Sequence, residues 1–153
     1  MEIIEQVLAE TPLLQGLTPA MLKAVAGKAR QVQFAGGEML FREGDEARQF
    51  FILTHGKVAL EIYALERGPI AIQTLGEGDA VGWSWLVPPH RWRFGARAVS
   101  LTRAIALDAQ ELNNLCEEDV RLGYELTKRF AILIAQRLDA TRLQLIDLYA
   151  TPH

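Results

Sequence analysis

The segment from Leu40 to Gly56, LFREGDEARQFFILTHG, decides how this chain folds. Its centre is a run of four apolar residues, Phe50 to Leu53, and turn residues stand at Gly44 and Gly56. A short apolar run bounded by turn signals is typical of a strand buried deep in a sheet. We expect both glycines to adopt positive φ, which glycine tolerates without steric cost. The segment therefore predicts a β-rich core.

Strand patterns continue on both sides of this segment. Apolar and polar residues alternate over residues 31–34, 58–63 and 70–74, and residues 39–41, 93–99 and 103–107 also fit strands. Glycine-containing turns separate them, for example at Gly36-Gly37 and Gly76 to Asp79. Short strands at this spacing predict an antiparallel sandwich or barrel over residues 31–107.

Helical patterns occupy the two ends of the chain. Residues 1–30 fit two helices, the second opened by a Thr18 N-cap followed by Pro19. Residues 108–150 fit a short helix, with Asp108 as N-cap and Glu111 at the capping-box position, and then a long helix over about 119–149. The 153 residues thus predict one domain, 1–153, that is mainly β with flanking helices.

Two apolar stripes run along the predicted long helix. The first can pack on the barrel, and it consists of Leu122, Leu126, Phe130 and Leu133. The second has the alternating steps of three and four of a coiled-coil seam, and it consists of Ala131, Ile134, Leu138, Thr141, Leu145 and Leu148. We expect the second stripe to pair with another copy in a twofold homodimer, although a helix packed only on its own domain remains open.

Composition restricts the function classes. The net charge of −3 argues against a surface built mainly for nucleic acid or acidic membranes. The chain has a single cysteine, Cys116, so no intrachain disulfide can form. No apolar run approaches the roughly 20 residues that span a bilayer, and no basic signal peptide precedes the first helix, so a cytoplasmic location is expected. No Ser/His/Asp, Cys/His or metal-spaced cluster is present, so we expect neither an enzyme nor a metal site.

The order of these patterns resembles the cyclic-nucleotide-binding domain of the catabolite-activator (CRP/FNR) superfamily. The resemblance covers essentially the whole chain and is most specific over residues 40–56, where the apolar pair, the turn glycines and the apolar run all match. It implies a double-stranded β-helix jelly roll followed by a long dimerisation helix. It also implies that residues 80–98, AVGWSWLVPPHRWRFGARA, occupy the place of the family's phosphate-binding cassette.

The cassette of this chain departs from the family pattern at two positions. In the family, a Glu accepts a hydrogen bond from the ribose and an Arg holds the cyclic phosphate. Here Gly82 matches, but Trp83 stands at the Glu position and Trp92 at the Arg position, counted back from Ala96-Arg97-Ala98. Alternation along a strand would turn Trp92 and Phe94 inward and Arg91 and Arg93 outward. A shift of one residue would instead make Arg93 the anchor, and this alternative stays open.

The aromatic residues of the cassette allow two interpretations. They form either a pocket for a flatter ligand or a filled core that receives no nucleotide. The candidate ligand-binding residues are Gly82, Trp83, Ser84, Trp85, Leu86, Arg91, Trp92, Arg93 and Phe94. No cofactor motif is present, and the candidate ligands are a cyclic nucleotide or another small aromatic molecule.

The long helix supplies the remaining candidate residues. Thr141 interrupts the apolar seam between Leu138 and Leu145, at a position similar to the family's base-contacting residues. It either contacts a ligand or bonds its own backbone and tunes the register. Because no helix-turn-helix follows this helix in the sequence, we expect a stand-alone dimeric sensor that acts through a protein partner and does not contact nucleic acid. The alternatives are an ordinary cyclic AMP or cyclic GMP receptor that uses Arg93, and a transcription regulator of the CRP/FNR type.

Overall fold

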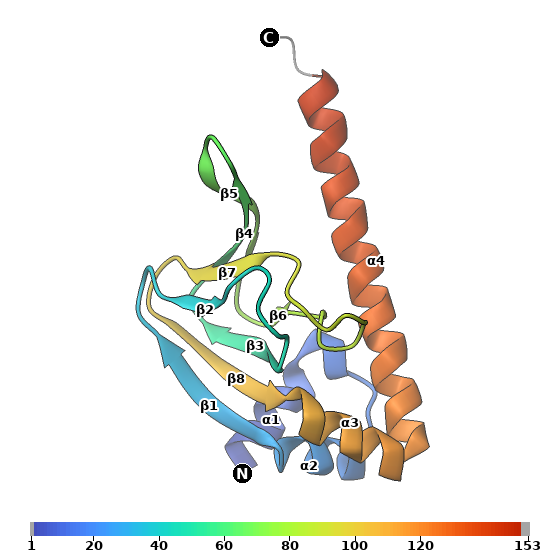
Figure 1. Ribbon diagram of the computed structural model, residues 1–153. Helices are drawn as coiled ribbons and strands as arrows, with labels where there is room; N and C mark the ends of the chain where they lie inside the picture. The colour runs from blue at the N-terminus through green and yellow to red at the C-terminus, as the bar shows by residue number, and fades with distance from the viewer. Residues whose placement is uncertain (1, 151–153) are drawn as a thin grey trace.

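Two four-stranded antiparallel sheets form the core of this computed structural model, which describes residues 2–150 and the side chains of residues 3–148. Figure 1 shows the sheets stacked beside a long helix, with shorter helices at one end. The helices are α1 (Glu2–Glu10), η1 (Pro12–Leu14), α2 (Pro19–Ala26), α3 (Ala109–Glu118) and α4 (Val120–Ala150). The strands are β1 (Ala29–Phe34), β2 (Met39–Phe41), β3 (Gln49–His55), β4 (Val58–Ala64), β5 (Gly68–Leu75), β6 (Ala80–Val81), β7 (Gly95–Ala98) and β8 (Thr102–Asp108).

The strand order confirms the predicted jelly roll. One sheet has the order β1-β8-β3-β6 and the other β2-β7-β4-β5, so most successive strands alternate between the two layers. The buried run 50–53 lies in β3, the inner strand between β8 and β6. Its residues Phe51 and Ile52 pair with Val81 and Ala80, which lead into the cassette. The segment that decides the fold therefore also positions the candidate site.

The turn glycines and helix N-caps predicted from the sequence are present in the structure. Gly44 and Gly56 both have a φ of 91°. The Thr18 hydroxyl accepts a hydrogen bond from the Met21 amide at 3.2 Å, and the Asp108 carboxylate accepts one from the Glu111 amide at 3.0 Å. These caps satisfy backbone donors that a helix start leaves free, so the predicted starts of α2 and α3 are confirmed.

The two apolar stripes of α4 have different surroundings. Leu122, Leu126 and Phe130 are 1%, 2% and 0% exposed and pack into the core. In the second stripe, Leu138 and Leu145 are 58% and 53% exposed. In Figure 1, the C-terminal half of α4 extends beyond the barrel in the same direction as the β4–β5 hairpin. Gln144 joins the two by donating to the Ile72 carbonyl at 2.8 Å.

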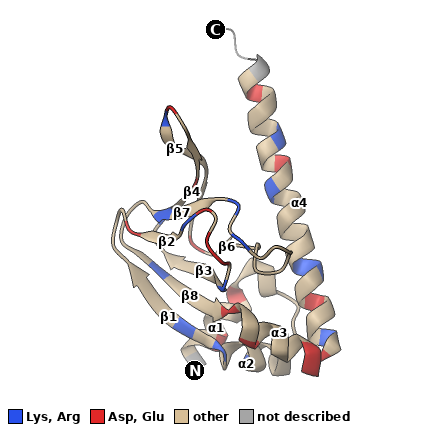
Figure 2. Ribbon diagram, in the orientation of Figure 1, with Lys and Arg blue, Asp and Glu red and all other residues tan. Residues whose placement is uncertain are grey.

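Charges are interspersed over the described surface. Figure 2 shows both acidic and basic residues along α4, so neither sign of charge occupies the whole helix. Among the described residues, no helix is long and apolar enough to cross a membrane.

Candidate functional site

The candidate site begins where β6 ends. Gly82 follows β6 with a φ of +101°, a conformation that side chains with a Cβ rarely adopt. The chain then makes a tight turn in which the Leu86 amide donates to the Trp83 carbonyl at 3.0 Å. We refer to residues 82–94 as the cassette from here on. The turn carries Trp83, Ser84 and Trp85 between the barrel and α4.

Trp92 lies directly over this turn. Its side chain is 4% exposed and stacks on Phe41 with ring centroids 3.6 Å apart and planes at 10°. A Cβ placed on Gly82 would stand 2.6 Å from the Cη2 and Cζ3 atoms of Trp92, well inside van der Waals contact. The indole therefore fills the space above Gly82, and a glycine is needed there for packing as well as for φ.

The turn of the fold-deciding segment holds the backbone of Trp92. The Trp92 amide donates to the Asp45 carbonyl at 2.9 Å, and the Gly44 amide donates to the Trp92 carbonyl at 2.8 Å. Two residues before Trp92, the His90 carbonyl accepts a hydrogen bond from the Ala47 amide at 2.8 Å. These bonds fix which way the Trp92 side chain faces.

Trp85 connects the cassette to α4. It is 2% exposed, stacks on Phe50 with centroids 5.2 Å apart, and meets Phe130 edge-on at 5.1 Å. Aromatic pairs in these arrangements are favourable beyond the area they bury. The Trp85 Nε1 and Ser84 Oγ atoms are buried and have no hydrogen-bond partner among the described residues.

The arginines of the cassette have partners at the surface. The exposed Arg93 guanidinium lies 5.1 Å from the Trp83 ring centroid and donates to the Pro88 carbonyl at 3.3 Å. Arg91, also exposed, donates to the Gly44 carbonyl at 3.0 Å. By contrast Phe94 is 8% exposed and packs edge-on against the half-buried Trp83 at 6.4 Å. The geometry thus has Trp92 and Phe94 inward and the two arginines outward, and Leu86 is half-buried against the core.

The candidate residues on α4 lie apart from the cassette rings. Leu138, Thr141 and Leu145 are exposed on the half of α4 that extends beyond the barrel. The Thr141 hydroxyl donates to the Arg137 carbonyl at 3.0 Å. This hydrogen bond to the helix's own backbone is the one expected of a seam residue. It uses the only hydroxyl proton of Thr141.

Sequence reasoning missed Arg137. This side chain of α4 donates through Nη2 to the Ala80 carbonyl, at the root of the cassette. Its Nη1 atom is buried without a partner among the described residues. Burial lowers the pKa of the Arg137 guanidinium, while the charge of Asp79 acts in the opposite direction. The signal was present, because Arg137 stands two helical turns after Phe130 and so faces the barrel.

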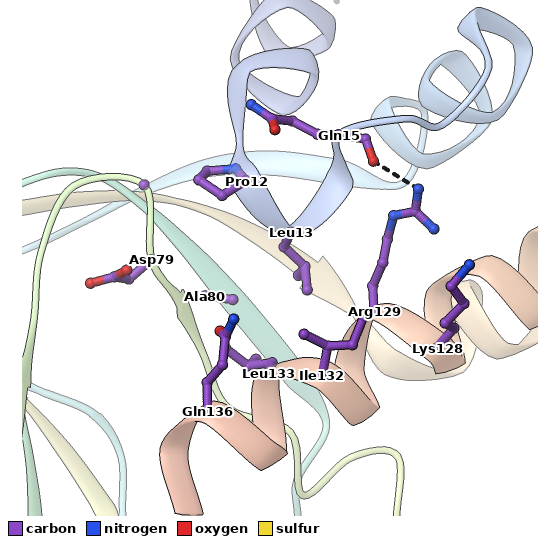
Figure 3. A pocket seen from close by; sticks show the side chains of 11 residues that line it. Pro12, Leu13, Gln15, Asp79, Ala80, Lys128, Arg129, Ile132, Leu133 and Gln136 are labelled. Atoms are coloured by element: carbon purple, nitrogen blue, oxygen red, sulfur yellow. Dashed lines mark hydrogen bonds between the residues drawn. The ribbon is translucent and has the colours of Figure 1, made fainter. Parts of the chain in front are cut away.

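A cavity of about 420 Å³ opens beside the cassette root. Figure 3 shows it between η1, the turn before β6, and α4. Arg129 crosses one end and donates through Nη2 to the Gln15 carbonyl at 2.7 Å. The wall of the cavity combines charged, amide and aliphatic groups. The residues that line it are Pro12, Leu13, Gln15, Gly78, Asp79, Ala80, Lys128, Arg129, Ile132, Leu133 and Gln136.

Groups with reactive chemistry are not gathered in the described part of the chain. No cluster of three or more His, Cys, Asp or Glu residues there could hold a metal ion. Burial, with a smaller contribution from the charge of Asp119, raises the pKa of the Cys116 thiol, which keeps it protonated and weakly nucleophilic.

Comparison with known proteins identifies the fold and its family. The family model described as "Cyclic nucleotide-binding domain" matches residues 31–119, which contain the barrel from the third residue of β1 onward, the cassette and α3. The chain belongs to the cyclic nucleotide-binding domain family. The predicted resemblance is therefore confirmed.

A curated protein similar to this cyclic nucleotide-binding domain is a transcriptional regulator. The chain is 24% identical over 148 residues to the CRP-like cAMP-activated global transcriptional regulator of Mycobacterium tuberculosis, covering 97% of this chain and 64% of that protein. The chain thus spans less than two thirds of the curated relatives it matches first.

Solved structures show the same fold at low identity. A cyclic nucleotide-binding domain from Methylobacillus flagellatus has a TM-score of 0.82 at 16% identity, covering 99% of this chain and 85% of the other. The sensor domain of the transcriptional regulator DNR from Pseudomonas aeruginosa has a TM-score of 0.74 at 19% identity, covering 90% and 93%.

Proposed function

We propose that this protein is a regulatory, ligand-sensing domain whose cassette does not bind cyclic AMP in the family's usual way. The observation that carries the proposal is the position of Trp92, stacked on Phe41 and packed against Gly82. An indole there supplies no charge for a cyclic phosphate. Trp83, at the position of the family's ribose-binding acid, supplies no carboxylate.

The expected loss of affinity is large. Removing the charged partner of a buried anion costs several kcal/mol, and removing a hydrogen-bond acceptor costs about 1–3 kcal/mol more. Because about 1.4 kcal/mol corresponds to a tenfold change in affinity, a micromolar site would weaken to millimolar or beyond. The outward Arg91 and Arg93 already bond backbone carbonyls and do not restore the charge.

A structural neighbour supports the idea that cassette changes alter ligand use within this fold. The regulatory subunit of a cAMP-independent protein kinase A from Trypanosoma brucei has a TM-score of 0.74 and 20% identity, covering 96% of this chain and 51% of that one. A triple variant of that subunit, in which one substitution replaces threonine with arginine, has cAMP bound.

Calorimetric titration with cyclic AMP and cyclic GMP tests this proposal. We expect no saturable heat at micromolar nucleotide. Tight binding would contradict the proposal, and the variant Arg93→Ala would then decide its cause. If Arg93→Ala abolished that binding, the alternative of an ordinary receptor anchored by Arg93 would be correct.

We also propose that the domain is a homodimer formed through the second stripe of α4. Three leucines of this stripe, Leu138, Leu145 and Leu148, are 53–59% exposed. Apolar residues at seam spacing are normally buried against a partner helix, so their exposure in a single copy indicates a missing partner. A second copy of α4 is the partner that matches this pattern, because a coiled-coil seam is complementary to itself. Dimerisation would bury these side chains.

The double variant Leu138→Glu/Leu145→Glu is expected to convert the dimer to a monomer. In a twofold coiled coil, each seam residue lies beside the same residue of the partner helix. A glutamate at position 138 or 145 would therefore meet a second glutamate, and the two like charges would repel in the buried seam. Light scattering after size exclusion measures the mass, and Leu143→Glu, on an equally exposed residue outside the seam, is the matched control. A wild-type monomer, or a double variant that stays dimeric, would contradict this dimer.

We infer a regulatory output through a protein partner, in the cytoplasm. A second candidate is transcriptional regulation, which the relation to the Mycobacterium tuberculosis regulator favours. A gel-shift experiment distinguishes the two, because specific DNA binding by the purified protein would favour the second candidate.

A further inference from the structure

Arg137 is positioned where α4 meets the root of the cassette. It follows Phe130 by two helical turns and Leu133 by one, so it continues the side of α4 that packs on the barrel. Its Nη2 atom donates to the carbonyl of Ala80, the first residue of β6 and only two residues before Gly82. A cation therefore stands at the base of the cassette, although it comes from the long helix and not from the cassette.

Part of this guanidinium has no acceptor. A guanidinium carries five N–H donors, and the Ala80 carbonyl takes a bond from Nη2. The Nη1 atom is buried and has no hydrogen-bond partner among the described residues. Leaving a buried, charged donor unpaired is costly, and such a group calls for an acceptor.

The charge of Arg137 makes no direct ion pair with a described residue, and the charge of Asp79 acts on it only from beyond ion-pair distance. No described carboxylate lies within ion-pair distance of it, and the nearby Asp79 accepts a hydrogen bond from the Gly76 amide at 2.8 Å. Two other arginines of α4 differ, because Arg129 pairs with Glu125 and the exposed Arg142 pairs with Asp139. An arginine stays protonated even when burial lowers its pKa, so the positive charge persists.

We propose that Arg137 anchors an anion-binding site between α4 and the root of the cassette, and that the ligand of this domain carries an oxyanion, a phosphate or a carboxylate. The oxyanion accepts from Nη1 in a charge-assisted bond, which is stronger than a neutral hydrogen bond. This inference rests on the proposed function, because it names the class of ligand that the domain senses.

Such a site also suits a sensor. A bound oxyanion on Arg137 contacts α4 and lies next to the Ala80 carbonyl, so it bridges the helix and the barrel. The Arg137 carbonyl accepts the hydroxyl of Thr141, one turn further along the exposed seam. Ligand binding thus acts on the part of α4 that we propose forms the dimer.

The test is a titration of the full chain with sodium phosphate, and separately with sodium acetate, at constant ionic strength set with sodium chloride. Backbone amide NMR signals of Ala80, Val81 and Arg137 are expected to shift with a saturable curve for at least one of the two anions. We expect Arg137→Gln to weaken the response at least tenfold and Arg137→Lys to retain part of it. Arg142→Gln, on the same helix, is expected to behave as the wild type.

Three results would overturn the proposal. These are an undiminished response in Arg137→Gln, shifts confined to Lys128 and Ile132 in the part of the neighbouring cavity lined by α4, and no saturable response to either anion up to about 50 mM. The wild-type Arg137 side-chain N–H signals report the contact directly and do not depend on a variant that folds.

Cyclic AMP added in the same experiment separates this proposal from the proposed function. Failure of both small anions with no cyclic AMP binding overturns only the Arg137 site. Tight cyclic AMP binding that requires Arg93 overturns the proposed function, and the anion titrations still decide the Arg137 site.

Discussion

Replacing Gly56 with alanine is expected to lower the free energy of unfolding by about 3–5 kcal/mol, because backbone strain and a steric clash add. Gly56 has a φ of 91°, and an added Cβ would stand 2.4 Å from the Leu101 carbonyl oxygen and 2.8 Å from the Thr102 Cα. Both atoms belong to the backbone where β8 begins, so the clash cannot be relieved by turning a side chain. Chemical denaturation measures the loss.

Gly37→Ala is the matched control for this substitution. Gly37 has the same φ of 91°, but nothing lies within 4 Å of an added Cβ. The free energy of unfolding of Gly37→Ala should fall only by the cost of a left-handed backbone conformation at alanine, about 1–2 kcal/mol. Equal losses in the two variants would show that the contact between Gly56 and the start of β8 is wrongly described.

The variant Phe130→Ala is expected to destabilise the protein by about 3–5 kcal/mol, the range for truncating a large buried aromatic residue. Phe130 is fully buried, and it meets Phe50 and Trp85 edge-on, each at 5.1 Å. Its loss removes the main aromatic contact between α4 and the cassette. Thermal unfolding gives the stability, and tryptophan fluorescence reports the changed surroundings of Trp85.

Tyr124→Ala, on the same helix, is the control for the loss of an aromatic ring. Tyr124 is 64% exposed, so its truncation is expected to change stability by about 0.5 kcal/mol or less. A Phe130→Ala variant as stable as Tyr124→Ala would contradict the packing of α4 on the barrel described above.

Much of the fold was predictable because its signals are local. The run 50–53 and its flanking glycines identified the central strand, and the caps at Thr18 and Asp108 marked helix starts. The strand predicted at 93–99 is shorter in the structure, Gly95–Ala98. The backbone of Trp92 bonds the turn at 44–45, which leaves only the later residues to pair with β2 and β4.

The candidate site was only partly predictable. Alternation correctly predicted that Trp92 and Phe94 are buried and that Arg91 and Arg93 are exposed. The stack of Trp92 on Phe41 was not foreseen, because it joins residues far apart in the sequence and depends on how the sheets meet. The spacing from Phe130 could have placed Arg137 on the barrel side of α4, but its acceptor, a backbone carbonyl in β6, depends on the tertiary fold.

The cyclic AMP affinity of Trp83→Glu/Trp92→Arg, compared with that of the wild type, tests the central claim most directly. The substitutions place a carboxylate and a guanidinium where this cassette has indoles. Circular dichroism first verifies that the double variant is folded. We predict no saturable wild-type binding at micromolar nucleotide and at least about 100-fold tighter binding by the double variant, equivalent to about 2.7 kcal/mol. Micromolar binding by the wild type, or a folded double variant that gains no affinity, would contradict the claim that these two tryptophans replace the usual anchors.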